Sequence, residues 1–160
     1  MWRAAALGVV TGLRSQLPTA LLAWRQSRGD LPEGVAPARL LERPGAVMFS
    51  VLAAVGELVA DKLPRTQSRL DQGPFFGRLA LGATAGAGIA GAFGRSRLLG
   101  GAAGAAGAAA GSVVGYRLRA LATRRTDVPD VVWALLEDAA AITLGLTATR
   151  AAITQATDEG

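Results

Sequence analysis

The sequence predicts an all-helical, polytopic transmembrane bundle, and three observations predict it. Of the 160 residues, 51% are apolar and only 18% are charged, and the mean hydropathy is +0.33, which is high for a water-soluble domain. The apolar residues gather in five long segments, each near the roughly 20 residues that a helix needs to cross a bilayer. Basic residues flank these segments, as at lipid headgroups, and no strand-like alternation competes with the helical pattern.

We expect one transmembrane domain over residues 1–153. Pro18 interrupts the first segment, and because proline has no N–H, the carbonyl of Arg14 loses its helical partner and the first helix is broken. Residues 25–45 form a polar loop with three prolines, and residues 154–160 form a polar tail. The five spans are expected at about 4–24, 46–63, 75–93, 98–121 and 131–149.

Glycines in the fourth segment recur at a spacing of four residues, which places them on one helix face. They are Gly100 and Gly104, followed by Gly107, Gly111 and Gly115. In lipid, such a face lets two backbones approach closely. A flexible linker is the alternative, but the apolar residues at both ends of this segment favour glycine-zipper packing. We also expect a homo-oligomer, although the sequence leaves open whether the glycine faces pack within one chain or between chains.

The composition excludes several classes of protein. The chain contains neither Cys nor His, which removes thiolate zinc sites, Cys nucleophiles and histidine acid–base chemistry. We therefore expect no cofactor, no metal and no enzymatic activity. The net charge of +5 does not indicate nucleic-acid binding, because the arginines lie between apolar runs and stacking aromatics are scarce.

Ionisable groups inside the predicted spans are costly in lipid, so they are candidates for a functional site. A cation beside a broken helix is typical of substrate sites in transporters. Alternation of five spans would bring most of the remaining charges to one membrane side as a polar vestibule. An interfacial ring of structural ion pairs is the alternative. The candidate ion or substrate site comprises Arg14, Ser15, Pro18, Glu57, Asp61, Lys62, Arg78, Arg117, Glu137 and Asp138.

At these residues the sequence resembles a bacterial integral-membrane family, domain-of-unknown-function family 4126. The resemblance rests on GLRSQLPTALLAW (12–24), GELVADKLP (56–64), Phe76-Gly77-Arg78, AGSVVGYRLR (110–119) and PDVVWALLEDA (129–139). It implies a small polytopic protein of the bacterial inner membrane and names no substrate. Many family members carry an acid near position 67, where this chain has Gln67.

Three functions are consistent with this pattern. The first is transport or permeation of a small ion or solute through the charged vestibule. The second is a non-catalytic scaffold or lipid-organising protein with structural ion pairs, and the third is an intramembrane carboxylate enzyme. Transport requires that water or ligand reach Arg14, whereas lipid handling requires charged groups that open sideways to the bilayer.

Orientation depends on a small excess of basic residues. With five spans, nine lie on the side of the N-terminus and seven on the other side. Because basic residues are retained in the cytoplasm, we expect a cytoplasmic N-terminus and an external C-terminus. So small an excess also allows insertion in both orientations.

Overall fold

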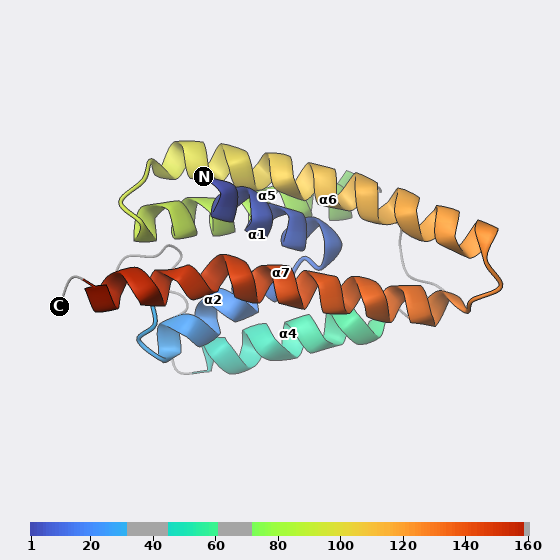
Figure 1. Cartoon of the computed structure of the whole chain (residues 1–160), viewed down its shortest axis with the longest axis horizontal. Coiled ribbons are helices and arrows are strands. Elements are labelled where there is room, and N and C mark those ends of the chain that lie inside the picture. The colour runs from blue at the N-terminus through green and yellow to red at the C-terminus, as the bar shows by residue number, and fades with distance from the viewer. Residues whose placement is uncertain (32–44, 61–71, 159–160) are drawn as a thin grey trace.

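The structure is a computed structural model, and it describes residues 1–31, 45–60 and 72–158. This part of the chain is all-helical and contains no strand, as the sequence predicts. The helices lie side by side in one elongated bundle (Figure 1). They are α1 (Trp2–Leu13), α2 (Leu17–Ser27), α4 (Ala46–Ala60), α5 (Gln72–Ala92), α6 (Arg97–Arg125) and α7 (Asp130–Asp158).

The predicted break in the first apolar segment separates α1 from α2. Arg14 has extended backbone angles (φ −140°, ψ 104°), and Pro18 occupies the first turn of α2. The carbonyl of Arg14 accepts a hydrogen bond from the N–H of Leu17 at 3.3 Å in place of the missing helical partner.

The expectation that residues 4–24 cross the bundle as one span is wrong, because the chain reverses at the break. A Cβ atom added to Gly145 of α7 would lie within 4 Å of both Val10 of α1 and Leu21 of α2. Ala4 and Leu22 likewise belong to one buried apolar cluster. The extended Arg14 and the helix restart at Leu17 allow the turn, so α1 and α2 form a helical hairpin (Figure 1).

This hairpin reaches only halfway along the bundle. Gly12 lies against Gly111, which is the middle residue of the 29-residue α6. Both ends of the hairpin, the α5–α6 turn and the end of α7 lie at the same end of the bundle (Figure 1). The five-span expectation would place the start of α1 and the end of α7 at opposite ends of the bundle, whereas the structure places them at the same end.

Helix α6 packs mainly on α1 and α5, through its glycines. Added Cβ atoms on Gly100 and Gly104 would meet the backbone of Gly86 and Gly82 in α5. Those on Gly107 and Gly111 would meet the backbone at Ala5, Gly8 and Val9 in α1, and Gly115 is buried on the same helix. These contacts all lie within one chain.

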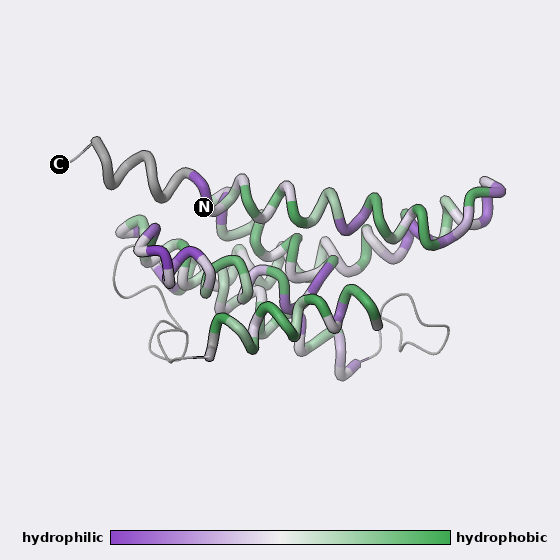
Figure 2. The backbone as a smooth tube through the Cα atoms, turned by 90° about the horizontal axis from the view of Figure 1, so that it is seen from below, coloured by the Kyte–Doolittle hydropathy of each residue, from purple (hydrophilic) through white to green (hydrophobic). Residues whose placement is uncertain are grey.

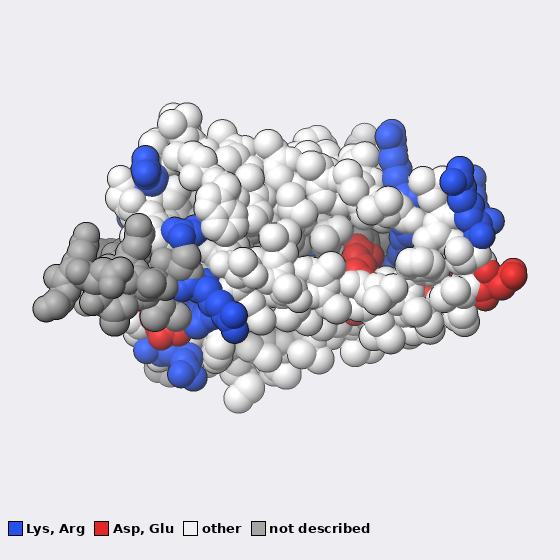
Figure 3. Space-filling model, in the orientation of Figure 1, with Lys and Arg blue, Asp and Glu red and all other residues white. Residues whose placement is uncertain are grey.

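On the face drawn in Figure 3, charged side chains gather mainly near the two ends of the bundle, and a broad apolar belt with few charges lies between them. The hydropathy colouring agrees: α4, between the two grey loops, is hydrophobic along most of its length (Figure 2). Phe49 of α4 is 75% exposed and Met48 is 66% exposed. Two helical segments, Arg97–Arg125 and Asp130–Arg150, are long and apolar enough to cross a membrane.

Candidate functional site

The tip of the hairpin carries a buried cation that is paired with α7. Arg14 is 1% exposed, and its Nε donates a hydrogen bond to Oδ1 of Asp138 at 2.5 Å. Its Nη1 donates to the carbonyl of Leu13 at 2.8 Å and lies 3.7 Å from Oε1 of Glu137. Because an unpaired charge at this depth would be costly, these contacts hold the hairpin tip against α7.

A carboxylate from α4 covers the start of α2. Oε1 of Glu57 accepts hydrogen bonds from the backbone N–H of Ser15 at 2.7 Å and from its hydroxyl at 2.6 Å. Oε2 accepts from the N–H of Gln16 at 2.8 Å. The N-terminus of a helix carries unsatisfied N–H groups and a positive partial charge. Glu57 accepts hydrogen bonds from two N–H groups at the start of α2 and its negative charge compensates the positive partial charge. Arg78 of α5 adds an ion pair to Glu57 at 3.4 Å.

The structure thus brings much of the predicted site together around the break, with side chains from the break itself and from α4, α5 and α7. Six candidates meet there: Arg14, Ser15, Glu57, Arg78, Glu137 and Asp138. Pro18 is buried in the first turn of α2. Arg117 is exposed on α6 and contributes to neither set of contacts. Asp61 and Lys62 lie outside the described residues, as does Gln67.

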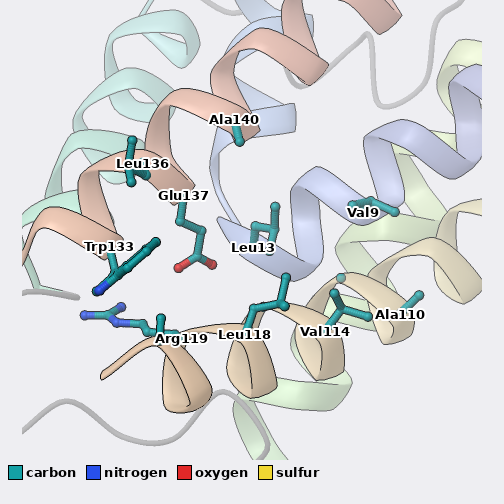
Figure 4. Close-up of a pocket in the computed structure, with 13 residues that line it drawn as sticks. Val9, Leu13, Ala110, Val114, Leu118, Arg119, Trp133, Leu136, Glu137 and Ala140 are labelled. Carbon is teal, nitrogen blue, oxygen red and sulfur yellow. The ribbon is translucent and has the colours of Figure 1, made fainter. Parts of the chain in front are cut away.

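A groove of about 600 Å³ opens beside this cluster, between α1, α6 and α7. Its walls are almost entirely apolar, and Figure 4 shows the carboxylate of Glu137 pointing into it. Trp133 and Arg119 lie at one end of the groove, and Val9 and Ala110 lie at the other (Figure 4). Glu137 therefore connects the groove to Arg14.

Sequence reasoning missed the groove and the ion pair at its mouth. Arg119 donates two hydrogen bonds to Asp130, from Nε at 2.8 Å and from Nη2 at 2.6 Å. Asp130 begins α7 and Arg119 lies in the last part of α6, so their opposite charges on either side of the connecting loop could have indicated the pair. Nothing in the sequence indicates the groove, because it depends on how far α6 and α7 diverge.

Comparison with known proteins places the chain in a family. The model of the domain of unknown function DUF4126 matches residues 2–156. The chain belongs to the DUF4126 family. The resemblance found in the motifs is thereby confirmed at the level of the family. No curated protein and no solved structure matches the chain.

Proposed function

We propose that this DUF4126 protein is an integral membrane protein in which α4, α5, α6 and α7 cross the bilayer and the α1–α2 hairpin enters it halfway. The apolar belt and the two long apolar helices support this arrangement. Helix α6, with 29 residues, is roughly 43 Å long, which exceeds the roughly 30 Å of hydrocarbon in a bilayer. The family resemblance supports placement in the bacterial inner membrane.

With a hairpin in place of the first span, charge no longer favours one orientation. Arg3 moves to the opposite side, so nine basic residues against seven become eight against eight. A cytoplasmic N-terminus stays a prediction, and insertion in both orientations is equally consistent with this balance.

Within the membrane, we propose that the protein binds a single-chain amphiphile in the groove between α1, α6 and α7. The observation that carries this proposal is the position of Glu137, which lines an apolar groove and also contacts the buried Arg14. A volume of about 600 Å³ lies within the range of small-molecule sites. Glu137 is the acidic residue of this lining, and the arginine of the lining, Arg119, is paired with Asp130. An amphiphile with a cationic head therefore fits better than one with an anionic head.

The arrangement of the other charges also favours lateral access over a polar pathway. Arg14 is 1% exposed and Asp138 is 7% exposed, so this ion pair is shielded from water. Glu137 opens sideways instead, toward the side of the bundle that would face lipid. The charges at the break then serve as a structural lock, as in the lipid-organising alternative.

Fluorescence of Trp133 tests this proposal, because Trp133 lines the groove. In a variant with Trp2→Phe and Trp24→Phe, Trp133 is the remaining tryptophan. A brominated alkyl trimethylammonium should quench it saturably, and a brominated fatty acid of equal length should do so more weakly. Ala140→Phe, which fills the groove, should abolish the saturable component, whereas Ala139→Phe, outside the lining, should leave it intact. Equal quenching in both variants would mean that the probe acts from the bulk lipid, and would refute the proposal.

Transport of a small ion or solute is the second candidate, and the hairpin itself favours it. A helix N-terminus halfway across the bundle, beside an arginine, is typical of anion sites in transporters. Here the carboxylate of Glu57 occupies those N–H groups, so transport would require Glu57 to leave. The test is the flux of small anions into proteoliposomes. A flux that Arg14→Gln abolishes and Arg119→Gln leaves unchanged would support this candidate. Absence of flux with the intact protein would exclude transport of the anions tested.

We also propose self-association, through α4 and not through the glycines of α6. The glycines of α6 are used within one chain, so we propose that a homo-oligomer would form through the exposed apolar face of α4, where Phe49 and Leu52 lie. The molecular mass in mild detergent, measured by light scattering, tests this: Phe49→Ser with Leu52→Ser should reduce an oligomer to a monomer, and a monomeric intact protein would refute it.

A further inference from the structure

A second, polar cavity of about 240 Å³ lies at the opposite end of the bundle from the α6–α7 loop. Its walls come from the start of α1, the end of α5 and the turn between α5 and α6. The lining residues are Met1, Trp2, Arg3, Ala4, Ile89, Ala90, Phe93 and Arg95. The cavity does not share a residue with the groove at Glu137.

The position of Arg3 is fixed by two aromatic rings. Its guanidinium carbon lies 4.1 Å from the centre of the Phe93 ring and 5.4 Å from that of Trp2. Such stacking orients a guanidinium and leaves its N–H groups available at the edge. The Nε of Arg3 is buried and has no hydrogen-bond partner among the described residues.

Arg95 supplies the second cation from a rigid turn. Gly94 has a positive φ of 61°, and the N–H of Arg95 donates a hydrogen bond to the carbonyl of Ala90 at 2.9 Å. The turn thus places Arg95 in the wall that Arg3 also lines. Two arginines from distant parts of the sequence face one cavity.

The described residues supply no carboxylate to balance these two charges inside the cavity. Asp30, just after the end of α2, is already paired with two other arginines, with Arg25 at 3.0 Å and with Arg28 at 3.7 Å. The lining itself contains no Asp or Glu. An anion would therefore stabilise the cavity, and arginine favours phosphate because its planar N–H groups match two phosphate oxygens.

We propose that this cavity binds a phosphate group, and specifically the phosphate of an anionic lipid headgroup. The cavity lies at the end of the apolar belt, where a headgroup would be found if the bundle crosses a bilayer. Trp2 in its wall is 56% exposed, as is typical of interfacial tryptophans. Leu98 and Leu99, just after Arg95, are 82% and 60% exposed and would contact the acyl chains.

Native mass spectrometry of the protein in detergent, with added phosphatidylglycerol or phosphatidylcholine, tests the proposal. The intact protein should retain phosphatidylglycerol about tenfold better, because the quaternary ammonium of phosphatidylcholine cancels the negative charge of its phosphate and is repelled by the two arginines; a tenfold ratio corresponds to about 1.4 kcal/mol. Arg3→Gln with Arg95→Gln should remove this preference. Arg124→Gln with Arg125→Gln, which removes two exposed arginines at the other end of the bundle, should preserve it.

Two further measurements complete the test. The first distinguishes lipid phosphate from soluble phosphate, and the second applies if the double variant does not fold. Millimolar inorganic phosphate that displaces the lipid would assign the cavity to soluble phosphate and overturn the lipid assignment, whereas no displacement supports a lipid. If the double variant does not fold, Arg95→Gln alone decides, because Arg95 is exposed. An unchanged preference for phosphatidylglycerol in the folded variant would overturn the proposal.

Discussion

Arg14 and Asp138 are separated by 124 residues in the sequence, yet Nε of Arg14 donates a 2.5 Å hydrogen bond to the carboxylate of Asp138. This contact joins the tip of the α1–α2 hairpin to α7 near the middle of the bundle. Both residues are buried, so each needs an opposite charge beside it, and Asp138 is the nearer of the two carboxylates that face Arg14.

Removal of one member of this pair should be more damaging than removal of both. Asp138→Leu leaves Arg14 with Glu137, 3.7 Å away, and should lower the free energy of unfolding by about 3–5 kcal/mol. Arg14→Met combined with Asp138→Leu should recover much of this loss, since no charge is left buried without a partner. Unfolding by denaturant in detergent measures both values.

The exposed pair between Arg119 and Asp130 provides the matched comparison. Asp130 has a side chain that is 49% exposed, so Asp130→Asn should cost only about 0.2–1 kcal/mol. A cost for Asp138→Leu no greater than that for Asp130→Asn would show that the buried pair does not hold the hairpin.

Adding a methyl group to a glycine of α6 should destabilise the fold at Gly104 but not at Gly101. A Cβ on Gly104 would overlap the carbonyl of Gly82 and lie 3.1 Å from Cα of Gly86. Gly104→Ala should therefore cost about 1–3 kcal/mol through overpacking. On Gly101 the nearest atom would be the carbonyl oxygen of Ala83 at 3.4 Å, so Gly101→Ala should be neutral or stabilising, because alanine favours helix.

Thermal unfolding of the two variants tests this difference. Equal melting temperatures would show that α5 and α6 do not approach as closely as the structure describes. A change in oligomer size without loss of stability in Gly104→Ala would instead assign this face to contacts between chains.

Neutralisation of Glu57 should loosen the start of α2 specifically. Glu57→Gln removes the negative charge from the helix N-terminus and the ion pair with Arg78, at a cost of about 1–2 kcal/mol. The amides of Ser15 and Gln16 should then exchange hydrogen faster, while those of α6 should not. Gly56→Ala is the control, because an added Cβ there meets no atom within 4 Å. Unchanged exchange at Ser15 would show that Glu57 does not cap α2.

The sequence predicted the helices and the break because both follow from local chemistry. Apolar length indicates a helix, and Pro18 after Arg14 indicates its interruption. It also indicated most charges that meet at the break, since ionisable residues in apolar segments need partners. The partners themselves, such as Asp138 for Arg14, depend on how distant helices pack.

The direction of the chain after the break could not be predicted in the same way. A broken helix and a helical hairpin have the same hydropathy, and they differ only in the backbone angles of Arg14 to Gln16. The single-span prediction placed the N-terminus and Arg3 at the wrong end of the bundle, whereas the hairpin leaves the assignments of the other basic residues unchanged. The cavity at Arg3 and Arg95 was missed for that reason.

The most direct test of the account is to measure whether the N-terminus lies on the same membrane side as the end of α2 or as the α6–α7 loop. The chain has no native cysteine, so single cysteines in place of Trp2, Gly29 and Asp127 can be labelled with a membrane-impermeant maleimide in oriented vesicles. A hairpin predicts that Trp2→Cys and Gly29→Cys label from the same side and Asp127→Cys from the other. Labelling of Trp2→Cys together with Asp127→Cys, opposite to Gly29→Cys, would show that residues 4–24 cross the membrane and would contradict the account.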